Sequence, residues 1–209
     1  MKIVFSFLTS WLLATLPSLA FSAQALEFSL HKNNSRTLTA ILATGSIGEG
    51  DTDRLRSYLS KLTVRNNVAV YLSSPGGNLY EGMRLGIFFK NSRIKTVVEG
   101  GYDCASACAL AFLGGTDSAG RTWRSSSDNS RLGFHAFRGV QNMAISPNQV
   151  QAIVADLLRY GRSVNAPIEL LIAGFDTPSE SIFWVSNQDI CALGIKLWSN
   201  RTNSWACNP

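Results

Sequence analysis

The chain has 209 residues, of which 45% are hydrophobic and 16% are charged, and its formal net charge at pH 7 is +5. This length and balance are typical of a single globular domain and exclude extensive disorder. The Lys and Arg residues are scattered and form no basic run interleaved with aromatic residues, which disfavours a nucleic acid as partner.

The first 25 residues have the pattern of a signal peptide. Lys2 supplies a positive start, residues 3–16 form an apolar run, and Ala-Gln-Ala at 23–25 predicts cleavage after Ala25. A retained membrane anchor is the alternative, but the run is shorter than the ~20 residues that a spanning helix needs. No other segment is long and apolar enough to span a bilayer. We therefore expect a periplasmic or secreted protein with one domain at 26–209 and no membrane span in its mature part.

The mature part alternates stretches that predict strands with stretches that predict helices. In chain order, strands are expected at 38–43, 67–73, 96–98, 132–137, 182–185 and 196–198, and helices at 51–62, 79–89, 106–113, from 147 onward, 167–171 and 188–193. Asp51 or Thr52 is the expected N-cap of the first helix. The polar stretch 116–130 is predicted to be a long loop, with at most a strand turn around Trp123. This alternation predicts an α/β fold with a mainly parallel sheet.

Export would permit disulfides, and the four cysteines allow three pairings. Cys104 and Cys108 are four residues apart, which in a regular helix separates their Cα atoms by about 6 Å, near the upper limit for a bridge. Our first expectation pairs Cys104 with Cys108 and Cys191 with Cys207, although the sequence alone does not choose among the pairings. A metal site is disfavoured, because the chain has only two histidines and no Cys-x-x-Cys pair. No organic cofactor is indicated.

Three separated segments carry residues typical of a serine hydrolase. Ser106 lies where a buried apolar helix is predicted to begin, so free backbone N–H groups and the helix dipole favour negative charge beside it. The Ser-Pro-Gly-Gly segment at 74–77 would add a second amide, since glycine lets a backbone approach a ligand closely. The N–H groups of Gly77 and Ala107 would then bind an oxyanion. His135, on a predicted strand, would take the serine proton.

Each of these pieces also has an ordinary structural explanation. Ser106 alone would be a helix N-cap, Pro-Gly-Gly alone would be a turn, and a histidine on an apolar strand is often a satisfied core residue. His31 lies in a polar N-terminal stretch and is a poorer candidate for the base. A third member of a triad should orient the imidazole ring. Asp176 is the candidate for that position, with Glu180 and Asn165 as alternatives.

Together, Ser-Pro-Gly-Gly at 74–77, Cys-Ala-Ser-Ala at 104–107 and a later Gly-x-His resemble the Clp protease proteolytic subunit and its relatives, which include signal peptide peptidase A. In particular, the chain resembles exported bacterial proteins of that superfamily with a Cys-Ala-Ser-Ala-Cys segment. The likeness extends from about residue 38 to residue 198. It implies a Clp/crotonase-like spiral of ββα units, with Ser106 as nucleophile, His135 as base, and Gly77 and Ala107 as oxyanion donors. The chain departs from Clp subunits after the nucleophile, where those usually have methionine and glycine.

The resemblance implies an exported serine peptidase that hydrolyses a peptide or protein substrate without ATP. The ATPase partner of Clp subunits is cytosolic, so export argues against that partnership. The main alternative is a catalytically inactive binding or scaffold protein of the periplasm that keeps the fold around an inert Ser106. The acyl-CoA chemistry of crotonases is disfavoured because coenzyme A is lacking outside the cytoplasm. The sequence is compatible with a homo-oligomer.

Overall fold

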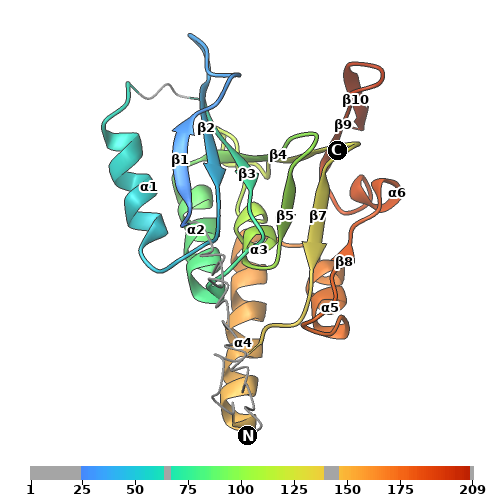
Figure 1. Cartoon of the computed structure of the whole chain (residues 1–209). Helices are drawn as coiled ribbons and strands as arrows, with labels where there is room; N and C mark the ends of the chain where they lie inside the picture. Colours follow the sequence, from blue (N-terminus) through green and yellow to red (C-terminus); the bar gives the residue numbers. More distant parts are fainter. Residues whose placement is uncertain (1–24, 64–66, 139–145, 208–209) are drawn as a thin grey trace, which may run out of the picture.

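A computed structural model describes residues 25–63, 67–138 and 146–207 (Figure 1). The predicted signal peptide, residues 1–25, lies outside the described residues except for Ala25. The described elements are β1 (Glu27–Leu30), β2 (Thr39–Thr44), α1 (Asp51–Ser60), β3 (Val68–Ser73), α2 (Leu79–Asn91), β4 (Ile94–Val98), β5 (Asp103–Ala105), α3 (Ala107–Phe112), β6 (Arg124–Ser127), β7 (Arg131–Phe134), α4 (Pro147–Val164), α5 (Ile168–Asp176), β8 (Phe183–Trp184), α6 (Asn187–Ile190), β9 (Lys196–Ser199) and β10 (Ser204–Cys207).

A seven-stranded sheet organises the described part of the chain, with strand order β1-β2-β3-β4-β6-β9-β10. Its inner pairs, from β2 to β9, are parallel, and β1 and β10 are antiparallel at the two edges. Because parallel neighbours need a crossover, α1 connects β2 to β3 and α2 connects β3 to β4. Helix α2 packs against α3 and α4; α2 and α3 lie near the centre of Figure 1, and α4 extends from there toward the bottom of the view. The predicted α/β class with a mainly parallel sheet is confirmed.

The alternation of side chains along β3 shows how the sheet divides its apolar residues. Val68, Val70 and Leu72 belong to the main core, whereas Ala69 and Tyr71 join a smaller cluster. Successive side chains of a strand point to opposite faces, so both faces of β3 are covered. That coverage explains why β3 forms a continuous apolar run in the sequence.

A second sheet of three strands, in the order β5-β7-β8, positions the candidate site. Strands β5 and β7 run parallel, with Ala105 opposite Gly133 in the register, and β8 is antiparallel to β7. The carboxyl ends of β5 and β7 therefore lie at the same edge. The residues that follow these two strands, among them Ser106 and His135, are brought to one place by this pairing.

Strands β1, β5, β6 and β10 were not predicted from the sequence. The clearest case is β6, which lies between β4 and β9 although the sequence pattern indicates a loop there. All four of its residues are buried, and its Arg124 guanidinium donates to Val164 O at 2.5 Å and to Asn165 O at 3.2 Å, at the end of α4. A polar strand can occupy the middle of a sheet when hydrogen bonds compensate for the burial of its polar groups.

Several boundaries also differ from the predictions by a few residues, and three of these differences change the place of a candidate residue. Strand β7 ends at Phe134, so His135 lies just beyond the strand and not on it. The N-cap of α1 is Gly50, which has φ 85°, and the Asp51 carboxylate accepts the Gly48 N–H at 2.8 Å instead of capping the helix. Helix α5 continues to Asp176, several residues beyond its expected end. Within the described ranges, no helix has both the length and the apolar character that crossing a membrane requires.

The expected disulfide pairing is confirmed. Cys104 is bonded to Cys108, with Cα atoms 5.2 Å apart, and Cys191 to Cys207, with Cα atoms 6.0 Å apart. The first bridge does not lie within one helix, because Cys104 is the middle residue of β5 and Cys108 is the second residue of α3. It therefore spans the turn between a strand and a helix. The second bridge attaches the C-terminal strand β10 to the end of α6.

Candidate active site

Ser106 forms the sharp turn between β5 and α3. Its backbone has φ 57° and ψ −125°, a conformation that glycine adopts readily and other residues avoid. The surrounding structure holds it there: Ser106 N donates to Gly133 O at 2.9 Å, and Ser106 O accepts the Leu110 N–H at 3.2 Å. A nucleophilic serine on a strained strand-to-helix turn is a recurrent arrangement in hydrolases, since it exposes the hydroxyl beside a helix N-terminus.

The glycine turn at 74–77 lies directly against this serine. A Cβ added to Gly76, which has φ 100°, would lie 2.6 Å from Ser106 Cβ and 3.0 Å from Ala107 N. Residue 76 therefore has no room for a side chain, and its backbone conformation also favours glycine. Helix α2 continues the close approach, because a Cβ on Gly82 would lie 2.9 Å from Ala107 Cβ. The predicted meeting of this turn with the start of α3 is thus present in the structure.

The backbone amides of the turn are almost all used. Ser74 N and Asn78 N donate to backbone carbonyl groups of neighbouring segments, and Gly76 N donates to the Ser74 hydroxyl oxygen at 3.1 Å. Pro75 has no N–H. Among the described residues, no acceptor is paired with the Gly77 N–H. Gly77 is an exposed residue that borders the same cavity as Ser106, so its amide is available to an incoming oxygen.

Ala107 supplies a second such amide. It is the first residue of α3, and the first N–H groups of a helix have no partner within the helix. In the part of the chain that the structure describes, no protein oxygen accepts the Ala107 N–H. Two unpaired amides are therefore close to Ser106: that of the next residue, and that of Gly77, which borders the same cavity. Backbone amides stabilise negative charge on an oxygen atom when they converge on it.

His135 borders the same cavity as Ser106. Its Nδ1 atom lies 2.7 Å from the carbonyl oxygen of Ala136. A carbonyl oxygen can only accept, so Nδ1 carries the hydrogen and Nε2 is the basic nitrogen. This is the tautomer that a general base needs. Within the described residues, Ser106 Oγ and His135 are not hydrogen-bonded, and such bonds are often long before substrate binds.

Asp176, the predicted third member of the triad, is not bonded to the histidine ring within the described residues. Asp176 is the exposed last residue of α5, and no hydrogen bond joins it to His135 in the described part of the chain. The segments themselves are adjacent, since Ala136 N donates to Thr177 O at 2.8 Å. Neither alternative is hydrogen-bonded to the ring in that part of the chain: Glu180 is exposed and pairs with Ser179, and Asn165 caps the end of α4. The partner of Nδ1 is instead the backbone carbonyl group of Ala136. Because every residue has a carbonyl group, the sequence could not indicate this partner.

A cavity of about 760 Å³ opens beside Ser106, His135 and Gly77. This volume lies within the range of about 300–1,000 Å³ that is usual for ligand sites. Most of its apolar lining comes from β7 and the segment after it and from α3, α4 and α5, and includes Leu110, Phe134, Phe137, Ile153, Leu157, Leu170, Leu171 and Phe175. The cavity is therefore suited to an apolar group next to the serine.

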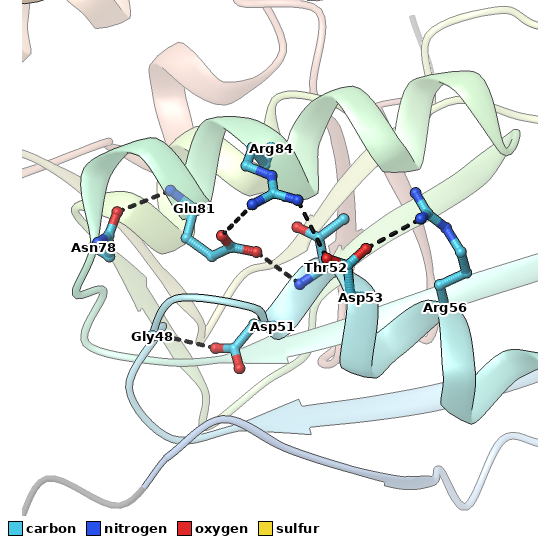
Figure 2. A network of polar contacts seen from close by, with 8 residues as sticks. All are labelled: Gly48, Asp51, Thr52, Asp53, Arg56, Asn78, Glu81 and Arg84. Carbon is cyan, nitrogen blue, oxygen red and sulfur yellow. Dashed lines mark hydrogen bonds and ion pairs between the residues drawn. The ribbon is translucent and has the colours of Figure 1, made fainter.

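A buried carboxylate at the start of α2, just after the glycine turn, joins this helix to α1. Sequence analysis did not identify it. Glu81, only 2% exposed, accepts the Thr52 N–H at 2.7 Å and contacts Arg84 at 3.4 Å, while its own N–H donates to Asn78 Oδ1 at 3.0 Å. Figure 2 shows that these contacts join the first turn of α2 to the start of α1. The segments that precede the two helices are bonded as well, because Asn78 N donates to Ile47 O at 2.8 Å. Glu81 therefore supports the segment that presents the Gly77 amide.

The contacts of Glu81 make stability depend on pH. Burial alone would raise the pKa of Glu81, but the hydrogen bonds from Thr52 and the Gly50 backbone, together with Arg84, hold it below its ordinary value of 4.5. A lowered pKa in the folded state means that the ionised form stabilises the fold above the unfolded pKa. That stabilisation is lost as the pH falls through the folded pKa.

We therefore expect a Glu81→Gln protein to lose less stability than the wild type between pH 5 and pH 3. At pH 7 the variant should be less stable by about 1–3 kcal/mol, because hydrogen bonds to a charged acceptor are weakened. Urea unfolding at pH 7, 5, 4 and 3 measures both effects. Glu169→Gln, at an exposed position of α5, is the control and should follow the wild type. Parallel wild-type and Glu81→Gln curves would contradict the assignment.

Comparison with solved structures identifies the fold. A variant of the 1510-N membrane-bound stomatin-specific protease is 14% identical and has a TM-score of 0.56, with 79% of each chain covered. A variant of ClpP1 from Listeria monocytogenes is 19% identical, with a TM-score of 0.50 over 78% of this chain and 93% of that one. The ClpP catalytic domain from Plasmodium falciparum is 22% identical, with a TM-score of 0.52 over 76% and 81%. No protein-family model and no curated protein sequence matches the chain.

Proposed function

From the Clp-protease fold that this chain shares with those three proteins, we propose that it is an exported serine peptidase that acts without ATP. The observation that carries the proposal is the position of Ser106, on a strained turn close to two unpaired amides and beside the same cavity as His135. Two disulfides in the described residues support export, because such bonds persist in oxidising compartments.

The proposed reaction follows from these positions. Ser106 Oγ attacks the carbonyl carbon of a peptide bond while His135 Nε2 takes the serine proton. The Gly77 and Ala107 N–H groups bind the oxygen that becomes negative. When the C–N bond breaks, the protonated histidine gives its proton to the departing amine, and water then hydrolyses the serine ester by the same route. The Ala136 carbonyl oxygen holds the ring in the role predicted for Asp176.

The apolar cavity supports a preference for substrates with an apolar side chain next to the cleaved bond. A bound apolar side chain would also exclude water from the serine, which strengthens the polar contacts of the reaction. The disulfide beside Ser106 does not displace the helix, because α3 begins at Ala107 with the bridge in place. This arrangement favours an active serine over an inert scaffold.

The test is reaction of the oxidised, folded wild-type protein with a fluorophosphonate probe, followed by mass-spectrometric mapping of the labelled peptide. We expect a single modified residue, Ser106, and competition by peptides with apolar side chains. Folded and oxidised protein that takes up no probe, or takes it up at another serine, would favour the inactive binding or scaffold protein.

A further inference from the structure

The Cys104–Cys108 disulfide encloses Ser106 within a loop of a few residues. Both cysteines are 0% exposed, and their Cα atoms are 5.2 Å apart. Cys104 belongs to β5 and Cys108 to α3, so the bridge connects the two elements that meet at the serine.

The backbone of Cys104 pairs with two other segments of the candidate site. In the parallel pairing of β5 with β7 it is opposite Leu132, three residues before His135. On its other side, the backbone of Cys104 pairs in an isolated parallel β-bridge with Ser74, three residues before Gly77. One strand residue is thus connected through backbone pairing to the segments of the base and of one oxyanion donor. The sulfur bond extends this connection to the helix that presents the second donor.

That helix is too short to hold its own geometry. Helix α3 has six residues, well below the length at which an isolated helix is stable in water. It begins directly after the unfavourable backbone conformation of Ser106, which persists only where the surroundings enforce it. A bond between Cys104 and Cys108 fixes the first turn of α3 against β5. It therefore limits the freedom of both the Ser106 hydroxyl and the Ala107 amide.

We propose that the Cys104–Cys108 disulfide is a positioning element for the reaction, and that its formation turns the peptidase on. The inference rests on the proposed function. In the exchange, two thiols lose two electrons and two protons, and the oxidant, a small-molecule or protein disulfide, becomes two thiols. The reduced protein keeps the fold but holds Ser106 and Ala107 loosely. Hydrolysis is then confined to oxidising compartments, so the enzyme stays slow before export.

The second disulfide provides a matched control. Cys191 and Cys207 are 16 residues apart, compared with 4 for the first pair. They join α6 to β10, and neither element lines the cavity beside Ser106. A disulfide that closes a longer loop stabilises more in the chain-entropy model. Simple stabilisation therefore predicts that loss of Cys191–Cys207 has the larger effect on the protein. Positioning predicts that loss of Cys104–Cys108 has the larger effect on the chemical step.

The first experiment compares Cys104→Ala/Cys108→Ala with Cys191→Ala/Cys207→Ala. It measures Tm, fluorophosphonate labelling rate, and kcat and KM on a fluorogenic peptide with an apolar residue before the cleaved bond. The first variant should lose about 10–100-fold in labelling rate and kcat with little change in KM, since a displacement of about 1 Å can cost 100-fold. The second should have the lower Tm of the two and a kcat near the wild-type value. The reverse order in kcat overturns the inference.

The second experiment removes any effect of the alanine side chains. In Cys191→Ala/Cys207→Ala protein, the remaining pair is reduced under denaturing conditions, refolded with reductant, and compared with the same protein after oxidation by glutathione disulfide. Circular dichroism and thiol counting verify the fold and the redox state. Oxidation should restore the labelling rate by the same factor. If neither form without the bond folds, the disulfide is a folding requirement and the positioning role is wrong.

The outcomes separate the two proposals. If the oxidised wild-type protein is not labelled, the proposed function fails and this inference falls with it. If the oxidised protein is labelled at Ser106 and the reduced protein reacts equally fast, the peptidase stands and only the positioning role is overturned.

Discussion

A Ser106→Gly protein is expected to be inert yet more stable than the wild type. The backbone of Ser106, at φ 57° and ψ −125°, is the kind of conformation that costs a residue with a Cβ about 1–3 kcal/mol. Glycine adopts it without that cost but loses about 1 kcal/mol through the greater freedom of the unfolded chain. The expected net gain in the free energy of unfolding is about 1 kcal/mol. Removing the hydroxyl should lower peptide hydrolysis by at least about 10⁴-fold and abolish fluorophosphonate labelling.

Urea unfolding and labelling of the same protein preparation measure the two effects together. Ser57→Gly is the matched control, because Ser57 is an exposed residue within α1. That substitution should destabilise the fold by about 0.5–1 kcal/mol, as glycine does within a helix, and leave labelling unchanged. A Ser106→Gly protein that unfolds at lower urea concentration than the wild type would show that its backbone is not strained. Retained labelling would show that another serine reacts.

The Ser106→Gly substitution is expected to raise stability and abolish activity. This opposition explains why the sequence pattern around Ser106 was informative. A serine in the small-residue segment Cys-Ala-Ser-Ala-Cys, placed between a strand and a helix, is a poor choice for stability. Gly76 and Gly77 likewise have no side chain at positions where the backbone approaches other chain segments closely. Local choices that conflict with stability cluster at functional sites, and they can be recognised from residue type and spacing. The fold could be predicted from the alternation of apolar strands and helices, which is also a matter of residue type and spacing.

Other features had no such signal. Strand β6 is composed of Arg and Ser, and only the carbonyl groups at the end of α4 explain why Arg124 can be buried there. The partner of the His135 ring is the Ala136 carbonyl oxygen, which any residue type would supply. Glu81 has the sequence context of a surface charge on an amphipathic helix, but it is buried against the start of α1. The burial of Arg124 and of Glu81 depends on long-range packing, which residue patterns do not encode locally.

Gly77→Ala is expected to produce the second large loss of activity. Gly77 has φ 144°, and a Cβ there would lie 3.0 Å from both the N and C atoms of Ile47 and closer still to its carbonyl oxygen. All three contacts are with backbone atoms, so they cannot be relieved by rotation of a side chain. The turn must shift away from Ile47, which weakens the bond from Asn78 N to Ile47 O and moves the free amide. Loss of one oxyanion donor lowers kcat by about 10²–10³-fold.

The measurement is kcat and KM for the fluorogenic peptide, together with urea unfolding. Gly194→Ala is the control, because Gly194 also has a positive φ, 69°, but an added Cβ would meet nothing within 4 Å. That variant should lose about 1–2 kcal/mol of stability, the cost of a left-handed conformation, with kcat unchanged. If Gly77→Ala loses similar stability and keeps the wild-type kcat, the Gly77 amide does not bind the oxyanion. If kcat falls only in Gly77→Ala, the loss is due to the displaced Gly77 amide and not to the backbone strain that both substitutions introduce.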